Sequence, residues 1–310
     1  MNNLTSSYFV VITLLISSFT HASQTANNFN LQKLSEGQYV HLGQQVSIED
    51  EQRDDIANIG FIIGDDCIAV IDTGGSIKIG QQLLTKIRTI SEKPICYVIN
   101  THVHFDHILG NKAFVEEETT FVGHRHLAAA VEQNREFFLQ QFRDSLEPDA
   151  NSDAIIGPDL LIQETMQIEL GNHNLTLISY PISHSHSDLV VVDNSSKTLW
   201  AGDLIFRERI PSLTGSLKGW IGVMESLTQL EIEKVVPGHG TIADSIAEAL
   251  HKQHRYLSKL LNETRKAIAE GQFLNDAIEQ IDKENEFNLL QHSYQHPTNA
   301  SRAYTELEWE

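Results

Sequence analysis

Short apolar runs alternate with amphipathic segments in the first half of the chain, and this alternation predicts the order of its elements. QYVHLGQQV and IGFIIGD predict two strands that end at turn residues. CIAVID predicts a buried strand, and the turn Thr73-Gly74-Gly75 follows it. Apolar residues from Ile79 to Ile90 then fall on one helical face, Pro94 ends that helix, and ICYVIN is another strand. This order predicts parallel pairing in a layered α/β fold.

The second half of the chain repeats this style without a strict internal repeat. A polar helix is expected from His126 to about Ser145, followed by a loop through EPDANSDAIIGPD. Strands are predicted for MQIEL, NLTLISY, LVVVD, TLWAG and EKVVPG, and helices beyond Ile242. Because no low-complexity linker interrupts the mature chain, we expect one domain over residues 24–310, with a C-terminal helical extension over about 245–310.

The first 23 residues have the pattern of a secretory signal peptide. MNNLTSSYFVVITLLISSFTHAS contains no Asp, Glu, Lys or Arg, and its apolar stretch from Phe9 to Phe19 is short for a bilayer span. Small residues at Ala22 and Ser23 suit a cleavage site. We predict a signal peptide over residues 1–23, a periplasmic or secreted protein, and no stable membrane insertion after cleavage. An uncleaved anchor or a disordered tail is the alternative.

Acidic residues outnumber basic ones, 42 against 22, which gives a formal net charge of −20. Binding to nucleic acid or to anionic membranes depends on Lys and Arg that release counterions. The composition therefore argues against a nucleic-acid partner and against binding to an anionic membrane surface. We expect a small-molecule substrate instead.

The two cysteines, Cys67 and Cys96, lie in the apolar runs DDCIAVID and PICYVIN. Each stands five residues before a polar residue at the end of its run, so the thiols would be level if the runs are neighbouring strands. An oxidising compartment would permit a disulfide. Two buried, small apolar residues are the interpretation that we favour, and the bridge remains open.

The segment HVHFDH gathers four ligand-type side chains within six positions. Side chains at i and i+2 of an extended segment point the same way, so His102 and His104 face one point if the preceding strand continues. Asp106 and His107 stand where the chain turns and can face a second point nearby. Because unpaired buried imidazoles are costly to desolvate, the cluster favours a metal centre, with room for two ions.

Three further segments supply ligand-type residues beside apolar runs. PISHSHSDLVVVD offers His184 and His186 before a strand, and TLWAGDL offers Asp203 after one. VVPGHG offers His239 between two glycines, which allow close backbone approach. Functional residues of α/β folds collect at such strand ends.

Together, HVHFDH, AGD and PGHG resemble, in order, the motifs of the metallo-β-lactamase superfamily, and AVIDTGG resembles its first motif. The resemblance covers roughly residues 38 to 245 and implies a four-layer αββα sandwich. DDCIAVIDTGG, NTHVHFDH, AGDLIFRERIP, VVPGHG and the final ELEWE look most similar to the quinoprotein relay system zinc metallohydrolases. Those are secreted proteins found with pyrroloquinoline-quinone-linked oxidation systems.

This resemblance implies a ligand set for two metal ions. The first ion would be bound by His102, His104 and His184, the second by Asp106, His107 and His239, and Asp203 would bridge the two. His184 is preferred to His186 because the superfamily's third motif often has a histidine four residues before an aspartate, here Asp188.

Other polar residues receive supporting roles. By resemblance, Asp72 orients ligands through hydrogen bonds, although it also suits a simple turn. His186 is expected beside the ligands or in the cleft. We expect His124 and His126 at the surface start of a helix rather than at the metals. Three cations flank the loop after Asp203 and either meet an anionic substrate or are solvated: Arg207, Arg209 and Lys218.

The nitrogen and oxygen ligands favour two Zn²⁺ ions over iron or manganese. The diiron branch of the superfamily has a glutamate where this chain has His104, which weakens the case for iron. Zinc lowers the pKa of bound water from 15.7 to about 7. We expect a shared hydroxide to attack the carbonyl carbon of an ester, lactone, thioester or amide ring, with Asp106 or Asp203 moving the proton as catalytic residues.

Three competing functions remain open. A β-lactamase is less favoured because acquired-type enzymes mostly have cysteine or serine at the Asp203 position. A mononuclear iron oxygenase of the persulfide type would require iron in the first site. A non-enzymatic protein that binds a quinone cofactor would show no turnover. A periplasmic quinoprotein dehydrogenase is a possible partner.

Overall fold

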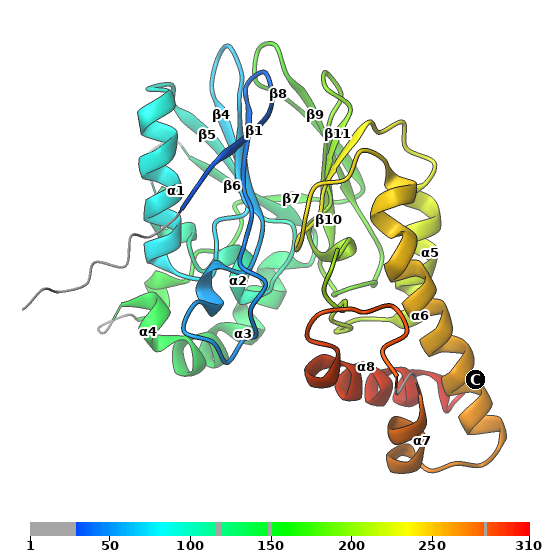
Figure 1. Cartoon of the computed structure of the whole chain (residues 1–310). Helices are drawn as coiled ribbons and strands as arrows, with labels where there is room; N and C mark the ends of the chain where they lie inside the picture. Colours follow the sequence, from blue (N-terminus) through cyan, green and yellow to red (C-terminus); the bar gives the residue numbers. More distant parts are fainter. Residues whose placement is uncertain (1–28, 116–118, 148–150, 282–283) are drawn as a thin grey trace, which may run out of the picture.

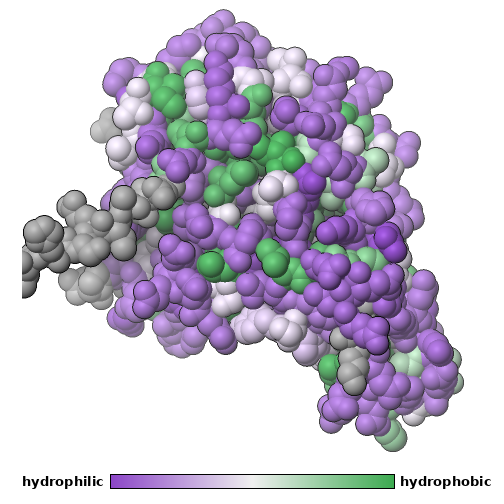
Figure 2. All heavy atoms as spheres, viewed as in Figure 1, coloured by the Kyte–Doolittle hydropathy of each residue, from purple (hydrophilic) through white to green (hydrophobic). Residues whose placement is uncertain are grey.

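The structure, a computed structural model, describes residues 29–115, 119–147, 151–281 and 284–310. The predicted signal peptide over residues 1–23 lies outside the described residues. None of the helices within the described ranges is long and apolar enough to cross a membrane. Hydrophilic side chains cover most of the face shown in Figure 2, consistent with a chain in which 21% of the residues are charged.

The first sheet has seven strands whose spatial order follows the chain. Its strands are β1 (Gln32–Ser35), β2 (Gln38–His41), β3 (Ile59–Ile63), β4 (Ile68–Ile71), β5 (Ile95–Ile99), β6 (Thr120–His124) and β7 (Leu160–Ile162). Neighbours from β1 to β4 are antiparallel, and those from β4 to β7 are parallel. The parallel pairing predicted for the two apolar runs of the first half is confirmed.

The second sheet has five strands in the order β12-β11-β10-β9-β8. Its strands are β8 (Thr165–Glu169), β9 (Asn174–Ser179), β10 (Leu189–Asp193), β11 (Thr198–Trp200) and β12 (Lys234–Val236). Only β11 and β12 are parallel. Because the ends of β11 and β12 and the start of β10 lie at one edge, residues that flank these three strands are brought together.

Helices cover the outer faces of both sheets (Figure 1). Against the first sheet lie α1 (Ile77–Ile90), α2 (Phe105–Ile108), α3 (Leu127–Gln141) and α4 (Arg143–Leu146). Beside the second lie α5 (Leu217–Leu227) and α6 (Ile246–Ala269), and the chain ends with α7 (Leu274–Gln280) and α8 (His292–Leu307). The predicted four-layer αββα fold is confirmed.

Successive side chains of the central strands point to opposite faces and pack into different layers of the fold. In β4, Ile68 and Val70 pack towards α1, whereas Ala69 and Ile71 pack into the core between the sheets. In β10, Val190 contacts the helical layer of the second sheet and Val191 faces the first sheet. Apart from Asp193 at the end of β10, these two strands are apolar because both of their faces are buried, as expected for the interior of a layered fold.

Several elements were missed or misplaced by the pattern of the sequence. The strands β1, β6 and β7 and the helix α5 were not predicted. The helix expected from His126 to Ser145 divides at Phe142 into α3 and α4. The predicted loop through EPDANSDAIIGPD contains a short 3-10 turn, Ser152–Ala154. The predicted helical character beyond Ile242 is confirmed.

Cys67 and Cys96 form a disulfide, with their Cα atoms 5.9 Å apart. The interpretation that the sequence favours, two free buried thiols, is therefore wrong. The pairing of β4 with β5 is parallel, and its register shifts between Ile68 and Ala69. This irregularity leaves Cys96 between two paired residues, Ile95 and Tyr97, within reach of Cys67.

The disulfide closes a loop of sequence separation 29 that contains α1. Because a cross-link limits the unfolded chain, we expect the double variant Cys67→Ala/Cys96→Ala to lose about 3 kcal/mol of free energy of unfolding. Urea unfolding of the variant beside the oxidised protein measures this difference. Equal midpoints and slopes, with two titratable thiols in the unreduced protein, would contradict the bridge.

Candidate metal centre

The site forms where strand ends from both sheets meet. Asp72 follows β4, and His102 lies three residues after the end of β5. Asp203 follows β11, and His239 follows β12. The backbone N–H of Leu189, at the start of β10, donates to the carbonyl of Thr101 at 2.8 Å and so joins the two sheets at this edge.

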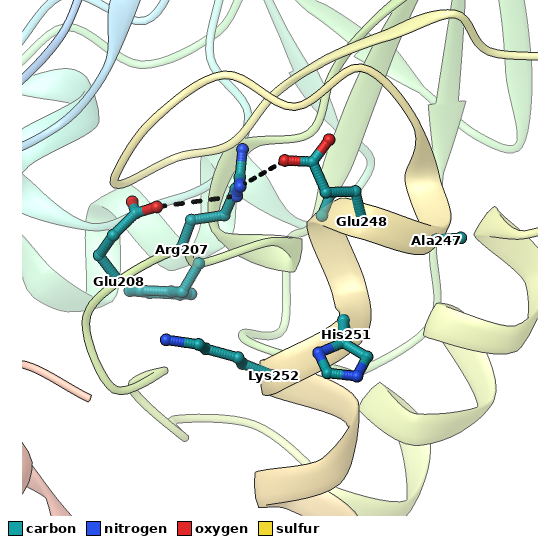
Figure 3. A pocket seen from close by; sticks show the side chains of 8 residues that line it. Arg207, Glu208, Ala247, Glu248, His251 and Lys252 are labelled. Atoms are coloured by element: carbon teal, nitrogen blue, oxygen red, sulfur yellow. Dashed lines mark hydrogen bonds and ion pairs between the residues drawn. The ribbon is translucent and has the colours of Figure 1, made fainter. Parts of the chain in front are cut away.

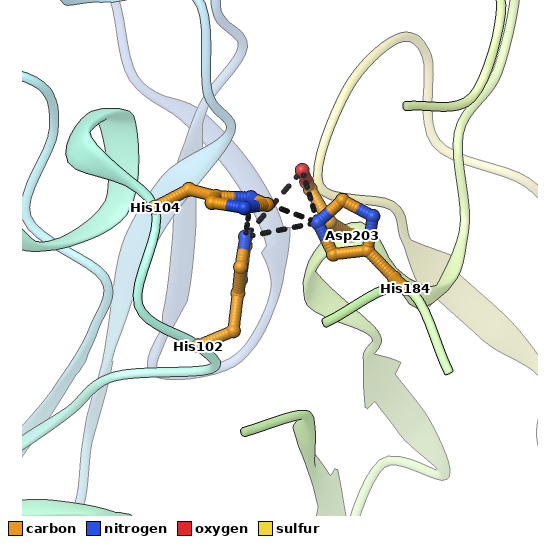
Figure 4. Close-up of side chains that lie close together, drawn as sticks. All are labelled: His102, His104, His184 and Asp203. Atoms are coloured by element: carbon orange, nitrogen blue, oxygen red, sulfur yellow. Dashed lines mark hydrogen bonds and ion pairs between the residues drawn. The ribbon is translucent and has the colours of Figure 1, made fainter. Parts of the chain in front are cut away.

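A first group consists of His102, His104, His184 and Asp203, whose ligand atoms all lie within 4.8 Å of one another. Nδ1 of His104 is 3.0 Å from Nε2 of His102 and 2.9 Å from Nε2 of His184. Oδ2 of Asp203 is 3.3 Å from Nε2 of His184. The four side chains converge from opposite sides on one point (Figure 4).

A second group consists of Asp106, His107 and His239. Nε2 of His239 is 3.3 Å from Oδ2 of Asp106, and Nε2 of His107 is 3.6 Å from the same oxygen. All three side chains are buried. The expectation that the HVHFDH segment faces two neighbouring points is confirmed, although β5 ends at Ile99, so His102 and His104 converge from a turn rather than from a continued strand.

Asp203 faces both groups with different oxygens. Its Oδ2 points to the first group, while its Oδ1 is 3.2 Å from Nε2 of both His107 and His239. Within the described residues, Oδ1 of Asp203 and Nε2 of His107 are buried without a hydrogen-bond partner. Such atoms are costly unless something binds them. The donor set therefore fits two metal ions that share this carboxylate.

Three imidazoles are oriented by acceptors on their outer side. Nδ1 of His107 donates to Oδ2 of Asp72 at 2.8 Å. Nδ1 of His184 donates to the carbonyl of Ser212 at 2.7 Å, and Nδ1 of His239 to that of Ile56 at 2.8 Å. Each bond fixes the tautomer that leaves the inner nitrogen lone pair free for a metal ion.

The other two imidazoles are oriented by threonine hydroxyls. The Thr101 hydroxyl donates to Asp72 and accepts from Nδ1 of His102 at 3.0 Å. The Thr214 hydroxyl donates to the carbonyl of His184 and accepts from Nε2 of His104 at 3.2 Å. His104 therefore presents Nδ1 inward, whereas the other four imidazoles present Nε2.

The pKa values of the imidazoles shift in opposite directions in the two groups. Burial lowers the pKa of His104 and of His184 to about 4, so both are neutral at neutral pH and can serve as ligands. Burial acts in the same direction on His107, but the carboxylates of Asp203, Asp106 and Asp72 outweigh it and raise the pKa of His107. A metal cation among these carboxylates would balance their negative charge in place of the proton on His107.

Asp72 behaves as predicted, since its carboxylate binds His107 and accepts from both the N–H and the hydroxyl of Thr101 at 2.8 and 2.7 Å. Its backbone φ of 53° lies in the left-handed region, which aspartate tolerates better than most residues.

The structure separates His184 from His186. The Asp188 carboxylate accepts from the hydroxyls of Ser183 and Ser185 at 2.7 and 2.6 Å and so curls the chain around His184. His184 is buried within the first group, whereas His186 is exposed and outside both groups. The preference for His184 agrees with this geometry, and the supporting role considered for His186 does not.

The pair His124 and His126 lies away from the ligands. His124 ends β6, is buried, and has Nε2 at 3.0 Å from the carbonyl of Tyr180. Its predicted surface position is therefore wrong, because the sequence did not reveal the strand that buries it. His126 is exposed at the start of α3, as predicted.

The three cations after Asp203 differ in their partners. Arg207 forms an ion pair with Glu248 at 2.7 Å in a surface hollow beside α6 (Figure 3), and Lys218 forms one with Glu310 at 2.8 Å. Arg209 is only 9% exposed, and its Nε and Nη1 have no hydrogen-bond partner among the residues that the structure describes.

The C-terminal helix α8 supports the site, which the sequence did not predict. The Asn299 amide donates to the carbonyl of Pro211 at 2.7 Å and accepts from the N–H of Leu213 at 3.0 Å. This fixes the segment whose Ser212 and Thr214 orient ligands. On another side, the Asn58 amide donates to the carbonyls of Pro237 and Gly240 at 2.8 and 2.9 Å and holds the His239 turn.

Comparison with known proteins agrees with this geometry. The family model described as the metallo-beta-lactamase superfamily matches residues 53–239. This span contains both groups of ligand-type side chains. The chain belongs to the metallo-β-lactamase superfamily, and the fold and site define it as a metal-dependent hydrolase of that class.

Curated relatives differ in activity. A probable metallo-hydrolase of Streptococcus pyogenes is 26% identical over 59% of this chain and 78% of its own length. An acyl-coenzyme A thioesterase of Gallus gallus is 27% identical over 66% of this chain and 79% of its own length. A linear primary-alkylsulfatase of a Pseudomonas species is 47% identical over 51 residues, 16% of this chain, and the chain matches only 10% of that protein.

Among solved structures, the sec-alkylsulfatase Pisa1 of Pseudomonas sp. has a TM-score of 0.65 at 16% identity. The match covers 89% of this chain and 50% of the sulfatase. This chain thus spans about half of the sulfatase's length, and the likeness concerns the fold alone.

His184 and His186 form a matched pair for testing the ligand assignment. We expect His184→Ala to reduce bound metal to about one ion per chain, because it removes a donor from the first group. His186→Ala is expected to retain the full wild-type content. Elemental analysis of both variants after equilibration with zinc measures this, and equal metal loss in the two would refute the assignment.

Gly238 allows the His239 turn to approach Asp203. A Cβ at this position would overlap Oδ1 of Asp203 and contact the backbone of Gly202. Gly238→Ala is therefore expected to displace the shared carboxylate and weaken metal binding by roughly tenfold or more. Zinc titration against a chromogenic chelator measures the affinity. Gly222→Ala is the control, since no atom lies near its added Cβ, and unchanged affinity in Gly238→Ala would contradict the account.

Proposed function

We propose that the chain is a dinuclear zinc hydrolase that cleaves the carbonyl bond of an ester, lactone, thioester or amide ring. The observation that carries the proposal is the placement of Asp203, whose two oxygens face two separate groups of imidazoles and carboxylates. Nitrogen and oxygen ligands without cysteine favour zinc. The thioesterase relative supports attack on an acyl carbon.

Two zinc ions would supply Lewis acidity and lower the pKa of water, so that a nucleophile is available near neutral pH. The chain's own residues would provide the rest. Outer hydrogen bonds hold the imidazoles rigid, so that a metal ion binds without rearrangement. Asp106 and Asp203 are the buried carboxylates within the two groups, and we assign them the transfer of a proton towards the leaving group.

Sulfate ester hydrolysis is a second candidate. The short match to the primary-alkylsulfatase has a higher identity than the matches to the metallo-hydrolase and the thioesterase. The sec-alkylsulfatase fold matches the C-terminal helices as well, since it covers 89% of this chain. A β-lactamase activity has less support, because Asp203 stands where acquired-type enzymes mostly have cysteine or serine. An iron oxygenase would require iron in the first group. A quinone-binding protein would show no turnover.

We further propose that the protein acts in the periplasm or outside the cell, beside a quinoprotein oxidation system. The apolar N-terminal segment and the likeness of DDCIAVIDTGG and AGDLIFRERIP to relay system proteins support this proposal. The disulfide is consistent with an oxidising compartment.

A hydrolysis screen tests the proposed reaction. We expect the zinc-loaded protein to hydrolyse at least one of a γ-lactone, an acyl thioester and a 4-nitrophenyl ester. Hydrolysis of dodecyl sulfate, measured in parallel, tests the second candidate, a sulfate ester hydrolase. Dialysis against a chelator should abolish turnover and zinc should restore it, because the metals supply the nucleophile. His102→Ala should be inactive and His186→Ala active. Turnover that survives in His102→Ala or in chelated protein would rule out the mechanism.

A further inference from the structure

The buried amide of Gln253 lies behind the loop that follows Asp203. Gln253 belongs to α6, and its side chain is only 1% exposed. Its Nε2 donates to the carbonyl of Leu204 at 2.8 Å, and its Oε1 accepts from the N–H of Phe206 at 2.7 Å. A side-chain amide carries both donors and an acceptor, so it can bind a backbone carbonyl and a backbone N–H together. Because Leu204 directly follows Asp203, the amide fixes the backbone beside the shared carboxylate.

Two aromatic rings connect this backbone to ligand imidazoles. The Phe206 ring stacks on that of His239, with their centroids 4.9 Å apart, and its centroid is 5.6 Å from that of His184. The Trp220 ring lies 5.0 Å from that of His184, and its N–H donates to the carbonyl of Leu204 at 3.0 Å. Both aromatic side chains are buried, and close-packed interiors transmit strain. A shift of the backbone at residues 204–206 would therefore move the surfaces against which His184 and His239 rest.

Asn299 on α8 holds the far end of the same loop. Its fully buried amide accepts from the N–H of Leu213 at 3.0 Å and donates to the carbonyl of Pro211 at 2.7 Å. The same amide donates to the Tyr256 hydroxyl at 3.0 Å, and Tyr256 stands three residues after Gln253 on α6. The amides of α6 and α8 therefore hold one loop from two neighbouring helices. Buried polar networks of this kind favour a single arrangement when their members are satisfied.

The two amides act on different ligands. The segment that the α8 amide holds contains Ser212 and Thr214. The Ser212 carbonyl orients His184, the Thr214 hydroxyl orients His104, and both imidazoles belong to the first group. The α6 amide instead fixes the backbone beside the carboxylate that faces both groups. Loss of the α8 amide should therefore affect one metal ion, and loss of the α6 amide should affect both.

We propose that Gln253 and Asn299 are positioning residues of the metal centre, so that the C-terminal helices set the affinity of the two groups for their metal ions. This inference rests on the two-metal centre of the proposed function and requires no particular substrate. Neither amide belongs to the ligand groups, and each acts through the backbone of residues 204–214. An amide with a purely structural role would stabilise the fold and leave metal binding by the folded protein unchanged.

The variant Gln253→Met tests the α6 amide, because methionine has a similar length and lacks the amide. Zinc titration against a chromogenic chelator measures the affinity of the folded protein. We expect both ions to bind more weakly, roughly tenfold to hundredfold, as is typical when a group that orients ligands is lost. The visible spectrum of the Co²⁺-loaded protein should shift as well, since it depends on coordination geometry.

Leu260→Ala is the matched control for stability. Leu260 is fully buried on α6, two turns beyond Gln253 on the same face of the helix. Its truncation leaves a cavity and should lower the thermal midpoint. We expect its zinc affinity and its Co²⁺ spectrum to match those of wild type, which separates a loss of stability from a loss of positioning.

Gln253→Glu is the conservative variant. Its carboxyl keeps an acceptor for the N–H of Phe206, and burial favours the protonated form, which also donates to the carbonyl of Leu204. We therefore expect Gln253→Glu to bind zinc more tightly than Gln253→Met. If Gln253→Met does not fold, Gln253→Asn replaces it, because the shorter side chain withdraws the same amide from the loop.

Asn299→Leu tests the difference between the two amides. We expect one zinc ion to bind roughly tenfold to hundredfold more weakly and the other to keep its wild-type affinity, because only ligands of the first group depend on this segment. The same titration, with Leu260→Ala beside it, measures both steps.

Two results would overturn the assignment. One is wild-type zinc affinity and an unchanged Co²⁺ spectrum in the folded Gln253 and Asn299 variants. The other is equal metal loss in these variants and in Leu260→Ala, which would make the amides structural. A protein that binds a single zinc ion would refute the two-metal centre, while weaker binding of that ion in Gln253→Met would leave the positioning role standing. Absence of turnover in the hydrolysis screen would refute the proposed reaction alone.

Discussion

The metal centre depends on one carboxylate, that of Asp203, which lies between two buried groups of ligand-type side chains. Oδ2 of Asp203 faces His184, and Oδ1 faces His107 and His239. Such an arrangement requires the backbones around it to come very close, which Gly202 permits with a φ of 50° and Gly238 permits by lacking a Cβ. Without cations, the lone pairs and charges gathered here would be unsatisfied. The centre is therefore a built binding site and not a by-product of packing.

The two sheets position the residues that surround Asp203. β4 and β5 of one sheet deliver Asp72 and the HVHFDH turn, and β11 and β12 of the other deliver Asp203 and His239. Five imidazoles converge, and each has its outer nitrogen engaged by a carbonyl, a hydroxyl or the Asp72 carboxylate. Preorganisation of this kind lets a metal ion bind without reordering side chains. Helix α8 contributes through Asn299, so the C-terminal extension takes part in the site.

The sequence predicted which ligand-type side chains lie together, because their motifs are local and stand beside apolar runs. His184 could be distinguished from His186 through its distance from Asp188, and the structure shows that this carboxylate shapes the turn around His184. Contacts between remote segments could not be predicted. Thr214 beside His104 and Asn299 beside Pro211 are separated by 110 and 88 positions. The disulfide was underestimated because a register shift in the β4–β5 pair cannot be read from spacing.

If two cations share Asp203, anomalous diffraction from crystals of the zinc-loaded protein will locate both of them. We expect two peaks about 3.5 to 4 Å apart, one within the His102, His104 and His184 group and one within the Asp106, His107 and His239 group, with Asp203 between them. A single peak, or peaks away from Asp203, would contradict it.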